Sequence, residues 1–183
     1  MIATMSLSRN RMGFFKDDKT YRKGMYTHMM YFNIKSPVSQ SYLQFARLLH
    51  CKNLVYDLSF DPLRIQNSNS SFLRDKLGID TNTKYILLNP NASELRLERR
   101  WPLEIWIQLI RFVAQEYSDY KLIVIGDGNE KEFVNSMVSQ IDELPQLMDS
   151  SGKLSLAELV FLISKASLMI TNDTGPMHLA FAL

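Results

Sequence analysis

From about residue 84 onward, short apolar runs alternate with amphipathic segments along the chain. Each run has the length of a strand, and the runs lie at residues 85–88, 121–125, 144–148 (the weakest) and 168–171. Such alternation is typical of parallel strands joined by crossover helices, because each helix carries the chain back to the start of the next strand. The sequence therefore predicts an α/β domain with a doubly wound parallel sheet.

Helical spacing and capping residues mark the segments between these runs. After Pro102, a buried helix face is predicted from Trp106, Leu109, Ile110 and Val113. Asn129 and Glu132 have the spacing of a capping box. In the helix predicted to follow, the side chains that point inward are those of Phe133, Met137 and Ile141. Ser155 and Glu158 repeat that spacing, before a helix whose predicted apolar face comprises Leu156, Leu159, Val160 and Ile163.

The first 80 residues have a different pattern. Residues 38–50 predict a helix, whereas residues 5–33 show little periodicity and many polar breaks. Residues 61–71 contain Pro62 and are rich in asparagine and serine, which is typical of a linker. The chain therefore divides into two parts of different character.

We expect residues 1–60 to be a remnant of an amino-terminal domain and residues 61–79 to be a linker. Residues 80–183 are expected to form most of a second domain. The sequence given ends at Leu183, only about two turns into the last predicted helix, which starts at Pro176. We therefore expect this domain to be truncated at its end.

The turn after the run at residues 168–171 has the features of an anion site. It contains Asn172, Asp173 and Thr174, and Gly175 and Pro176 then open a helix. Unpaired backbone N–H groups at a helix amino terminus point outward, and the helix dipole favours negative charge there. This turn is therefore predicted to bind a phosphate group.

Charge and composition exclude several other classes of protein. The net charge of +2 is too small to indicate nucleic-acid binding. Cys51 is the single cysteine, which excludes an internal disulfide and a cysteine-based metal cluster and fits a reducing compartment. The chain has no apolar run near the roughly 20 residues of a membrane span and no secretion signal, so we expect a cytoplasmic location. Peripheral association of the chain with the inner face of a membrane is the alternative.

Five segments, taken in order, resemble the lipopolysaccharide heptosyltransferases, which form glycosyltransferase family nine. They are residues 88–93 (LNPNAS), 99–102 (RRWP), 126–130 (GDGNE), 152–159 (GKLSLAEL) and 172–180 (NDTGPMHLA). The resemblance implies a GT-B fold, in which two doubly wound domains face each other. It further implies that the carboxyl-terminal domain holds a nucleotide-diphosphate sugar.

By this resemblance, the last segment holds the donor. Thr174 and Gly175 would bind phosphate through backbone N–H groups, and Asp173 would contact sugar hydroxyls; the alternative for Asp173 is a plain helix cap. His178 would face the same phosphates from the first helical turn. A histidine packed in the core is the alternative.

The other segments add further donor-binding residues by resemblance. Arg99 or Arg100 would bind the donor phosphates; a solvated charge run that includes Arg96 is the alternative. Ser93 would donate its hydroxyl to phosphate, and Glu130 would accept hydrogen bonds from ribose hydroxyls unless it is simply a first-turn helix acid. Asn91 stands where the family often has glycine, in a turn that asparagine tolerates well.

The resemblance also implies the reaction. Family members transfer a sugar, such as a heptose, from the nucleotide donor to a lipopolysaccharide or related glycan, with inversion and without a metal or cofactor. The general base is usually an aspartate near the start of the amino-terminal domain, and no segment of this chain matches it. We therefore expect this chain to be the donor-binding half of an enzyme and to be inactive by itself. The alternatives are a non-catalytic nucleotide-sugar-binding module and a sugar-nucleotide epimerase of the same fold.

Overall fold

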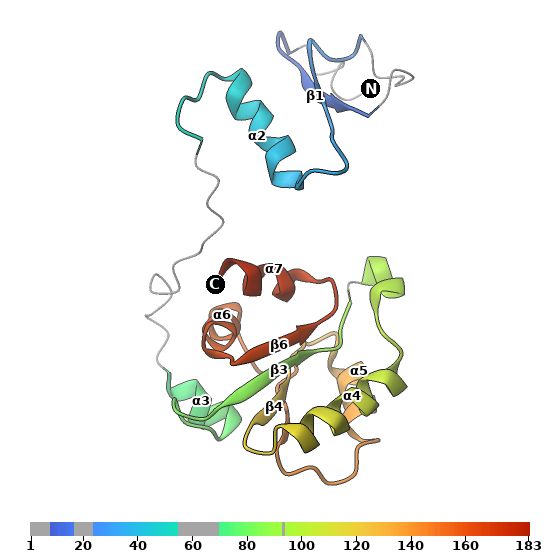
Figure 1. Ribbon diagram of the computed structural model, residues 1–183, viewed down its shortest axis with the longest axis vertical. Helices are drawn as coiled ribbons and strands as arrows, with labels where there is room; N and C mark the ends of the chain where they lie inside the picture. The colour runs from blue at the N-terminus through green and yellow to red at the C-terminus, as the bar shows by residue number, and fades with distance from the viewer. Residues whose placement is uncertain (1–7, 17–23, 55–69, 93) are drawn as a thin grey trace. The chain divides into compact units, whose positions relative to one another are not determined.

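The computed structural model describes residues 8–16, 24–54, 70–92 and 94–183. The chain divides into two compact units, Met1–Asp57 and Leu58–Leu183. Each unit is described by itself below, and Figure 1 shows the elements of both. Within the described residues, no helix combines the length and the apolar character needed to cross a bilayer.

The first unit pairs two short strands in parallel. Strands β1 (Met12–Phe15) and β2 (His28–Tyr31) lie side by side, and helix α2 (Val38–Leu48) follows them. The ring of Phe14 packs against both Phe32 and Phe45, with centroid separations of 5.5 and 4.9 Å. The helix confirms the expectation for residues 38–50, whereas the two strands lie where the sequence showed little periodicity.

The second unit contains a four-stranded parallel sheet. Its strands are β3 (Tyr85–Asn89), β4 (Lys121–Val124), β5 (Leu147–Asp149) and β6 (Leu168–Thr171), arranged in the order β5-β4-β3-β6. All three neighbouring pairs are parallel, as the alternating pattern predicts. The weakest predicted strand, at residues 144–148, is found later and is only 3 residues long.

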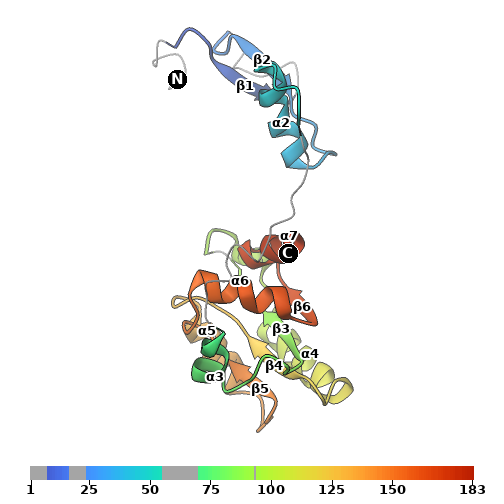
Figure 2. The ribbon, with the colours of Figure 1, turned by 90° about the vertical axis from the view of Figure 1, so that its left-hand side faces the viewer.

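Helices cover both faces of this sheet (Figures 1 and 2). Helices α4 (Leu103–Glu116) and α5 (Lys131–Val138) lie on one face, and α3 (Ser71–Leu77), α6 (Leu156–Lys165) and α7 (Gly175–Ala182) lie on the other. Along β3, Ile86 and Leu88 point to the first face and Leu87 points to the second. Because both faces of the strand are buried, apolar residues are needed on both, which explains the continuous apolar run at residues 85–88.

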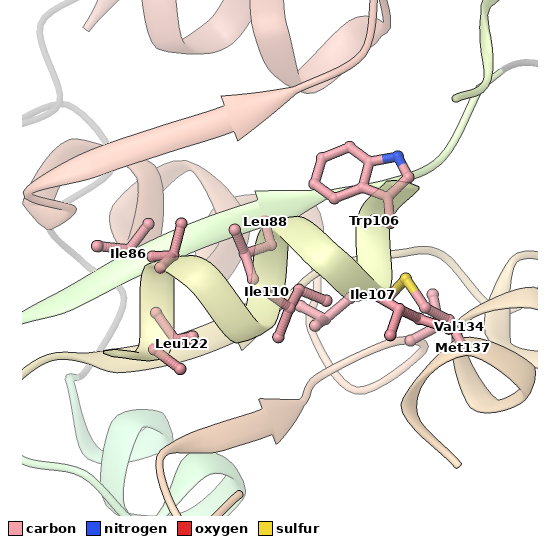
Figure 3. Packing of buried hydrophobic residues seen from close by; sticks show 11 residues of the cluster. Ile86, Leu88, Trp106, Ile107, Ile110, Leu122, Val134 and Met137 are labelled. Carbon is pink, nitrogen blue, oxygen red and sulfur yellow. The ribbon is translucent and has the colours of Figure 1, made fainter. Parts of the chain in front are cut away.

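The core under α4 is shown in Figure 3. Trp106 and Ile110 of α4 are almost fully buried against Leu88 and Leu122, and Met137 of α5 joins the same cluster. These contacts confirm the helix face predicted after Pro102, although Leu109 is only partly buried. Trp101, which lies before the helix, packs its ring 5.9 Å from that of Trp106.

Helix α3 lies within residues 61–79, the predicted linker. Its Phe72, Leu73 and Leu77 are at most 4% exposed and belong to the core of the second unit. Gly78 ends the helix in the left-handed conformation, which glycine adopts without steric cost. The carboxyl-terminal part of that predicted linker is therefore folded into the second unit. Residues 55–69 lie outside the described residues.

One of the two predicted capping boxes is confirmed. At the start of α6, the Ser155 hydroxyl accepts a hydrogen bond from the backbone N–H of Glu158, and the Glu158 carboxylate accepts one from Ser155 N–H. The box predicted from Asn129 and Glu132 is wrong, because α5 begins after Glu130 and no side chain caps it. The reciprocal bonds instead form two residues earlier, between Asp127 and Glu130, as described below.

Candidate functional site

The carboxyl ends of β3 and β6 border the place where the chain reverses its winding. After β3 the chain continues to α4 on one face, whereas after β6 it continues to α7 on the other. In open parallel sheets, ligands bind in the crevice at such a switch point. The residues that follow these two strands are therefore the first candidates for a binding site.

Three buried asparagines join the ends of the strands at this point. The Asn172 side-chain amide donates to the carbonyl oxygens of Pro90 (2.9 Å) and Asn91 (3.3 Å). The Asn91 amide donates to the Ile125 carbonyl (2.8 Å) and to the Asn89 side-chain oxygen (3.3 Å). The ends of β3, β4 and β6 are therefore tied together by side chains as well as by the sheet.

Asn89 orients Thr174 within this network. Its amide nitrogen donates to the hydroxyl oxygens of Thr171 (2.9 Å) and Thr174 (2.7 Å), which uses both of its hydrogens. The Thr171 hydroxyl donates in turn to the carbonyl of Asn172 (2.8 Å). The Thr174 hydroxyl hydrogen has no acceptor in the part of the chain that the structure describes, so it can donate to a ligand.

A cavity of about 360 Å³ opens beside Thr174. Its volume falls within the range of small-molecule sites. Three of the predicted site residues, Glu130, Thr174 and Gly175, line it together. The other described residues that line it are Asn89, Ile125, Gly126, Asp127, Leu154, Ser155, Leu156, Leu159 and Pro176.

Helix α7 opens at this cavity without a side-chain cap. Thr174 is its N-cap residue, in an extended conformation, and Pro176 occupies the first turn. Proline suits this position because its missing N–H would have no partner there. The positive end of the helix dipole therefore faces a cavity, as the sequence predicts for an anion site. The alternative for Asp173, a plain helix cap, is wrong.

The turn after β4 also contributes to the lining of the cavity, through Gly126, Asp127 and Glu130. The Asp127 carboxylate accepts hydrogen bonds from the N–H groups of Asn129 (2.8 Å) and Glu130 (3.0 Å), and the Glu130 carboxylate accepts one from Asp127 N–H (2.9 Å). Gly126 packs closely behind them, because a Cβ there would lie 3.0 Å from the Asn91 amide nitrogen. Burial raises the pKa of Glu130, and the neighbouring Asp127 charge adds to this.

Arg99 and Asp173 are paired with each other. Arg99 Nη1 lies 2.7 Å from Asp173 Oδ2, and both side chains are about half exposed. The charged residues on the two sides of the switch point therefore meet directly, and neither lines the cavity. Arg96 takes no part in this pair, because it bonds Glu98 (3.0 Å).

Arg100 does not line the cavity. Its guanidinium lies over the ring of Phe133, 4.1 Å from the centroid, and donates to the Ala92 carbonyl (3.3 Å). His178 lies in the first turns of α7 and is exposed, so the alternative of a core histidine is wrong, but it does not line the cavity either. Ser93 lies outside the described residues. The structure thus gathers part of the predicted site.

The sequence model of glycosyltransferase family 9 (heptosyltransferase) matches residues 1–183. The chain belongs to this family. It is 29% identical over 195 residues to lipopolysaccharide heptosyltransferase 1 of Campylobacter coli, covering 100% of this chain and 54% of that protein. It is 25% identical to lipopolysaccharide heptosyltransferase 2 of Salmonella typhimurium, over 72% of this chain and 38% of that protein. The family 9 chain therefore spans about half the length, or less, of these relatives.

Solved structures share its fold. A family 9 glycosyltransferase from Veillonella parvula superimposes with a TM-score of 0.66 at 20% identity, over 96% of this chain and 48% of that one. The structure titled E. coli ADP-heptose lps heptosyltransferase II superimposes with a TM-score of 0.64 at 19% identity. The match covers 97% of this chain and 54% of that one. These findings confirm the predicted family and the predicted α/β fold of the GT-B type.

Proposed function

We propose that this family 9 chain is the donor-binding part of a glycosyltransferase that acts in lipopolysaccharide or related glycan synthesis. The donor is a nucleotide-diphosphate sugar with a heptose-like sugar, and its diphosphate lies at the amino terminus of α7. The observation that carries this proposal is the cavity at the switch point, where an uncapped helix terminus and the Thr174 hydroxyl face the same space.

Positive charge at this position supports release of the nucleotide diphosphate. The leaving group gains negative charge as the bond to the sugar breaks, and donors that are already oriented stabilise that charge. The backbone N–H groups at Thr174 and Gly175 and the nearby Arg99 guanidinium would supply such stabilisation without a metal. We therefore assign the metal-independent, inverting reaction to this site.

The activity of the whole enzyme is part of the proposal. An acceptor hydroxyl must lose its proton to a general base, and we assign this role to no residue of the present chain. We expect the chain alone to bind donor without transferring the sugar. We further propose that the enzyme works in the cytoplasm and reaches a glycolipid acceptor at the membrane surface.

A titration with ADP and ADP-heptose tests this function, because the E. coli relative is named for the latter donor. Calorimetry should show that both compounds bind the chain at one site. The absence of binding by either compound would disprove the proposal. Incubation with ADP-heptose should leave its sugar unchanged, whereas an epimerase would isomerise it. A non-catalytic module would bind the donor but fail to support transfer in the complete protein.

The pair between Arg99 and Asp173 gives a prediction about charge. Changing Asp173→Asn should raise the affinity for ADP by about 2- to 5-fold, because Arg99 is released and a carboxylate is removed from the neighbourhood of a phosphate. The affinity for ADP-heptose should not rise in parallel if Asp173 contacts sugar hydroxyls. Calorimetric titration of both ligands measures the difference. Arg96→Ala is the control, since its pairing with Glu98 lies outside this pair.

Glu130 gives a prediction about pH. A ribose hydroxyl donates more strongly to a carboxylate than to a carboxylic acid, and burial raises the pKa of Glu130 above its ordinary value. ADP affinity should therefore fall as the pH is lowered, beginning above the ordinary titration range of glutamate. Glu130→Gln should lower the affinity at neutral pH by about 3- to 10-fold and should flatten the profile. Parallel profiles for the two proteins would show that Glu130 does not contact the ribose.

A further inference from the structure

The charged side chains that line the cavity are acidic. Among the described residues of the lining, Asp127 and Glu130 carry charge, and no lysine, arginine or histidine joins them. Both lie in the turn after β4, and Glu130 is partly buried. Burial and a second carboxylate nearby each disfavour the charged form of a carboxyl group. A positive charge close to this turn would oppose both effects.

Arg100 is held beside the helix that Glu130 opens. Its guanidinium carbon lies 4.1 Å from the centroid of the Phe133 ring, and Phe133 lies in the first turn of α5, directly after the N-cap residue Glu130 and two others. The Arg100 Nη2 group also donates to the Ala92 carbonyl (3.3 Å). A guanidinium is attracted to the face of an aromatic ring, so the ring gives this flexible side chain a fixed position. The loop after β3 and the start of α5 therefore hold the cation between them.

These contacts leave the charge of Arg100 uncompensated. The Phe133 ring and the Ala92 carbonyl are neutral groups, and the buried Nε of Arg100 has no hydrogen-bond partner among the described residues. Arg99 differs, because its charge is paired with Asp173 at 2.7 Å. The charge of Arg100 can therefore act on a neighbouring carboxylate.

Glu130 is the carboxylate on which this charge acts. Burial raises the pKa of Glu130 and the Asp127 charge adds to this, whereas the hydrogen bond from Asp127 N–H and the charge of Arg100 lower it. The other charged residues of the adjoining segments are exposed or bonded within their own loop; they are Lys131, Glu132, Asp149 and Lys153. Arg100 is therefore the cation that is placed to favour the charged form of Glu130.

We propose that Arg100 is a positioning residue that, held on the Phe133 ring, keeps the Glu130 carboxylate ionised at the cavity. A carboxylate accepts stronger hydrogen bonds than a carboxylic acid does. The inference rests on the proposed function in one respect, namely that Glu130 accepts from the ribose of the donor. The two arginines before α4 then have different roles. Arg99 serves the phosphates, whereas Arg100 acts through Glu130.

A pH titration of the ligand-free protein tests this role. NMR follows the side-chain carboxyl carbon of Glu130, which is assigned from its loss in Glu130→Gln. In Arg100→Gln the titration midpoint of Glu130 should rise by about 0.5–1 pH unit. Phe133→Leu keeps the charge but removes the ring that holds it, so the midpoint should rise here too. Arg96→Gln is the matched control. It removes one positive charge from the same segment, where that charge is paired with Glu98, and should leave the midpoint in place.

The pH dependence of ADP binding supplies a second readout. In Arg100→Gln the fall of ADP affinity on acidification should begin about 0.5–1 pH unit higher than in the unchanged protein. Inorganic pyrophosphate has no ribose, so its affinity should keep the same pH profile in this variant. A purely structural role of Arg100 would lower the affinity for ADP at every pH without moving the profile.

An unmoved midpoint of Glu130 in Arg100→Gln would overturn the inference, provided that far-UV circular dichroism shows the variant to be folded. An unmoved midpoint in Phe133→Leu would also overturn it, and this variant decides the question if Arg100→Gln does not fold. Equal losses of ADP and pyrophosphate affinity in Arg100→Gln would place Arg100 on the phosphates instead. If the midpoint rises but ADP affinity does not follow it, the ribose contact of the proposed function fails and the role of Arg100 stands.

Discussion

Replacing Thr174 with valine should weaken ADP binding by about 10- to 100-fold, which is the range for loss of a hydrogen bond to a charged group. The hydroxyl accepts a hydrogen bond from Asn89 (2.7 Å) and is left to donate toward the cavity. Valine keeps the shape of threonine but cannot donate, so the phosphate loses an oriented partner. Calorimetric titration with ADP and with pyrophosphate measures the loss, which should be equal for the two ligands.

Thr171→Val is the matched control for this change. Thr171 accepts from the same Asn89 amide (2.9 Å), and it is not among the residues that line the cavity. Its replacement should lower the stability of the protein without a comparable loss of ADP affinity. Equal weakening by the two variants would mean that the Asn89 network acts only by holding the strand ends, and that Thr174 does not touch the phosphate.

Replacing Trp106 with alanine should lower the free energy of unfolding of the second unit by about 3–5 kcal/mol. Trp106 is 1% exposed and fills the space between α4 and β3, together with Ile86, Leu88 and Ile110 (Figure 3). Alanine would leave a cavity that the rigid sheet cannot close. Urea unfolding followed by far-UV circular dichroism measures the change. The dependence of the unfolding free energy on urea concentration should be the same for the variant and the unchanged protein.

Trp101 provides the comparison within the same chain. Its ring contacts Trp106 but is 51% exposed, so Trp101→Ala should lower the free energy of unfolding by less than about 1.5 kcal/mol. A similar loss for both tryptophans would contradict the assignment of Trp106 to the core of this unit. Comparing the two variants therefore distinguishes the stability contributed by a buried tryptophan from that of a half-exposed one.

Local patterns allowed much of this fold to be predicted. Strands β3, β4 and β6 are apolar runs bounded by polar turns, and both features are contained in a few consecutive residues. The capping box at Ser155 depends on a spacing of three residues and was predicted for the same reason. Thr174 and Gly175 could be placed near Glu130 because parallel strands end at one edge of a sheet.

Features that depend on distant residues could not be predicted. The Asn89 to Thr174 bond joins residues 85 positions apart. The pairing of Arg99 with Asp173 likewise depends on how two loops meet. Asn91 was interpreted as a turn residue, yet its backbone is not among the positive-φ positions of the described residues, and its side chain bonds Ile125. Leu156 fits the apolar period of α6, but it is the first residue of that helix and its side chain is exposed.

The three buried asparagines limit how the family 9 chain can be engineered. Each of them bonds a group on a different segment, so exchanging one loop for that of a relative would leave donors or acceptors of another loop without partners. A designer who wants a new donor preference should therefore leave residues 89–91 and 171–174 intact. The start of α6 is the better place for variation, because its exposed Leu156 can be changed while the strand ends keep their bonds.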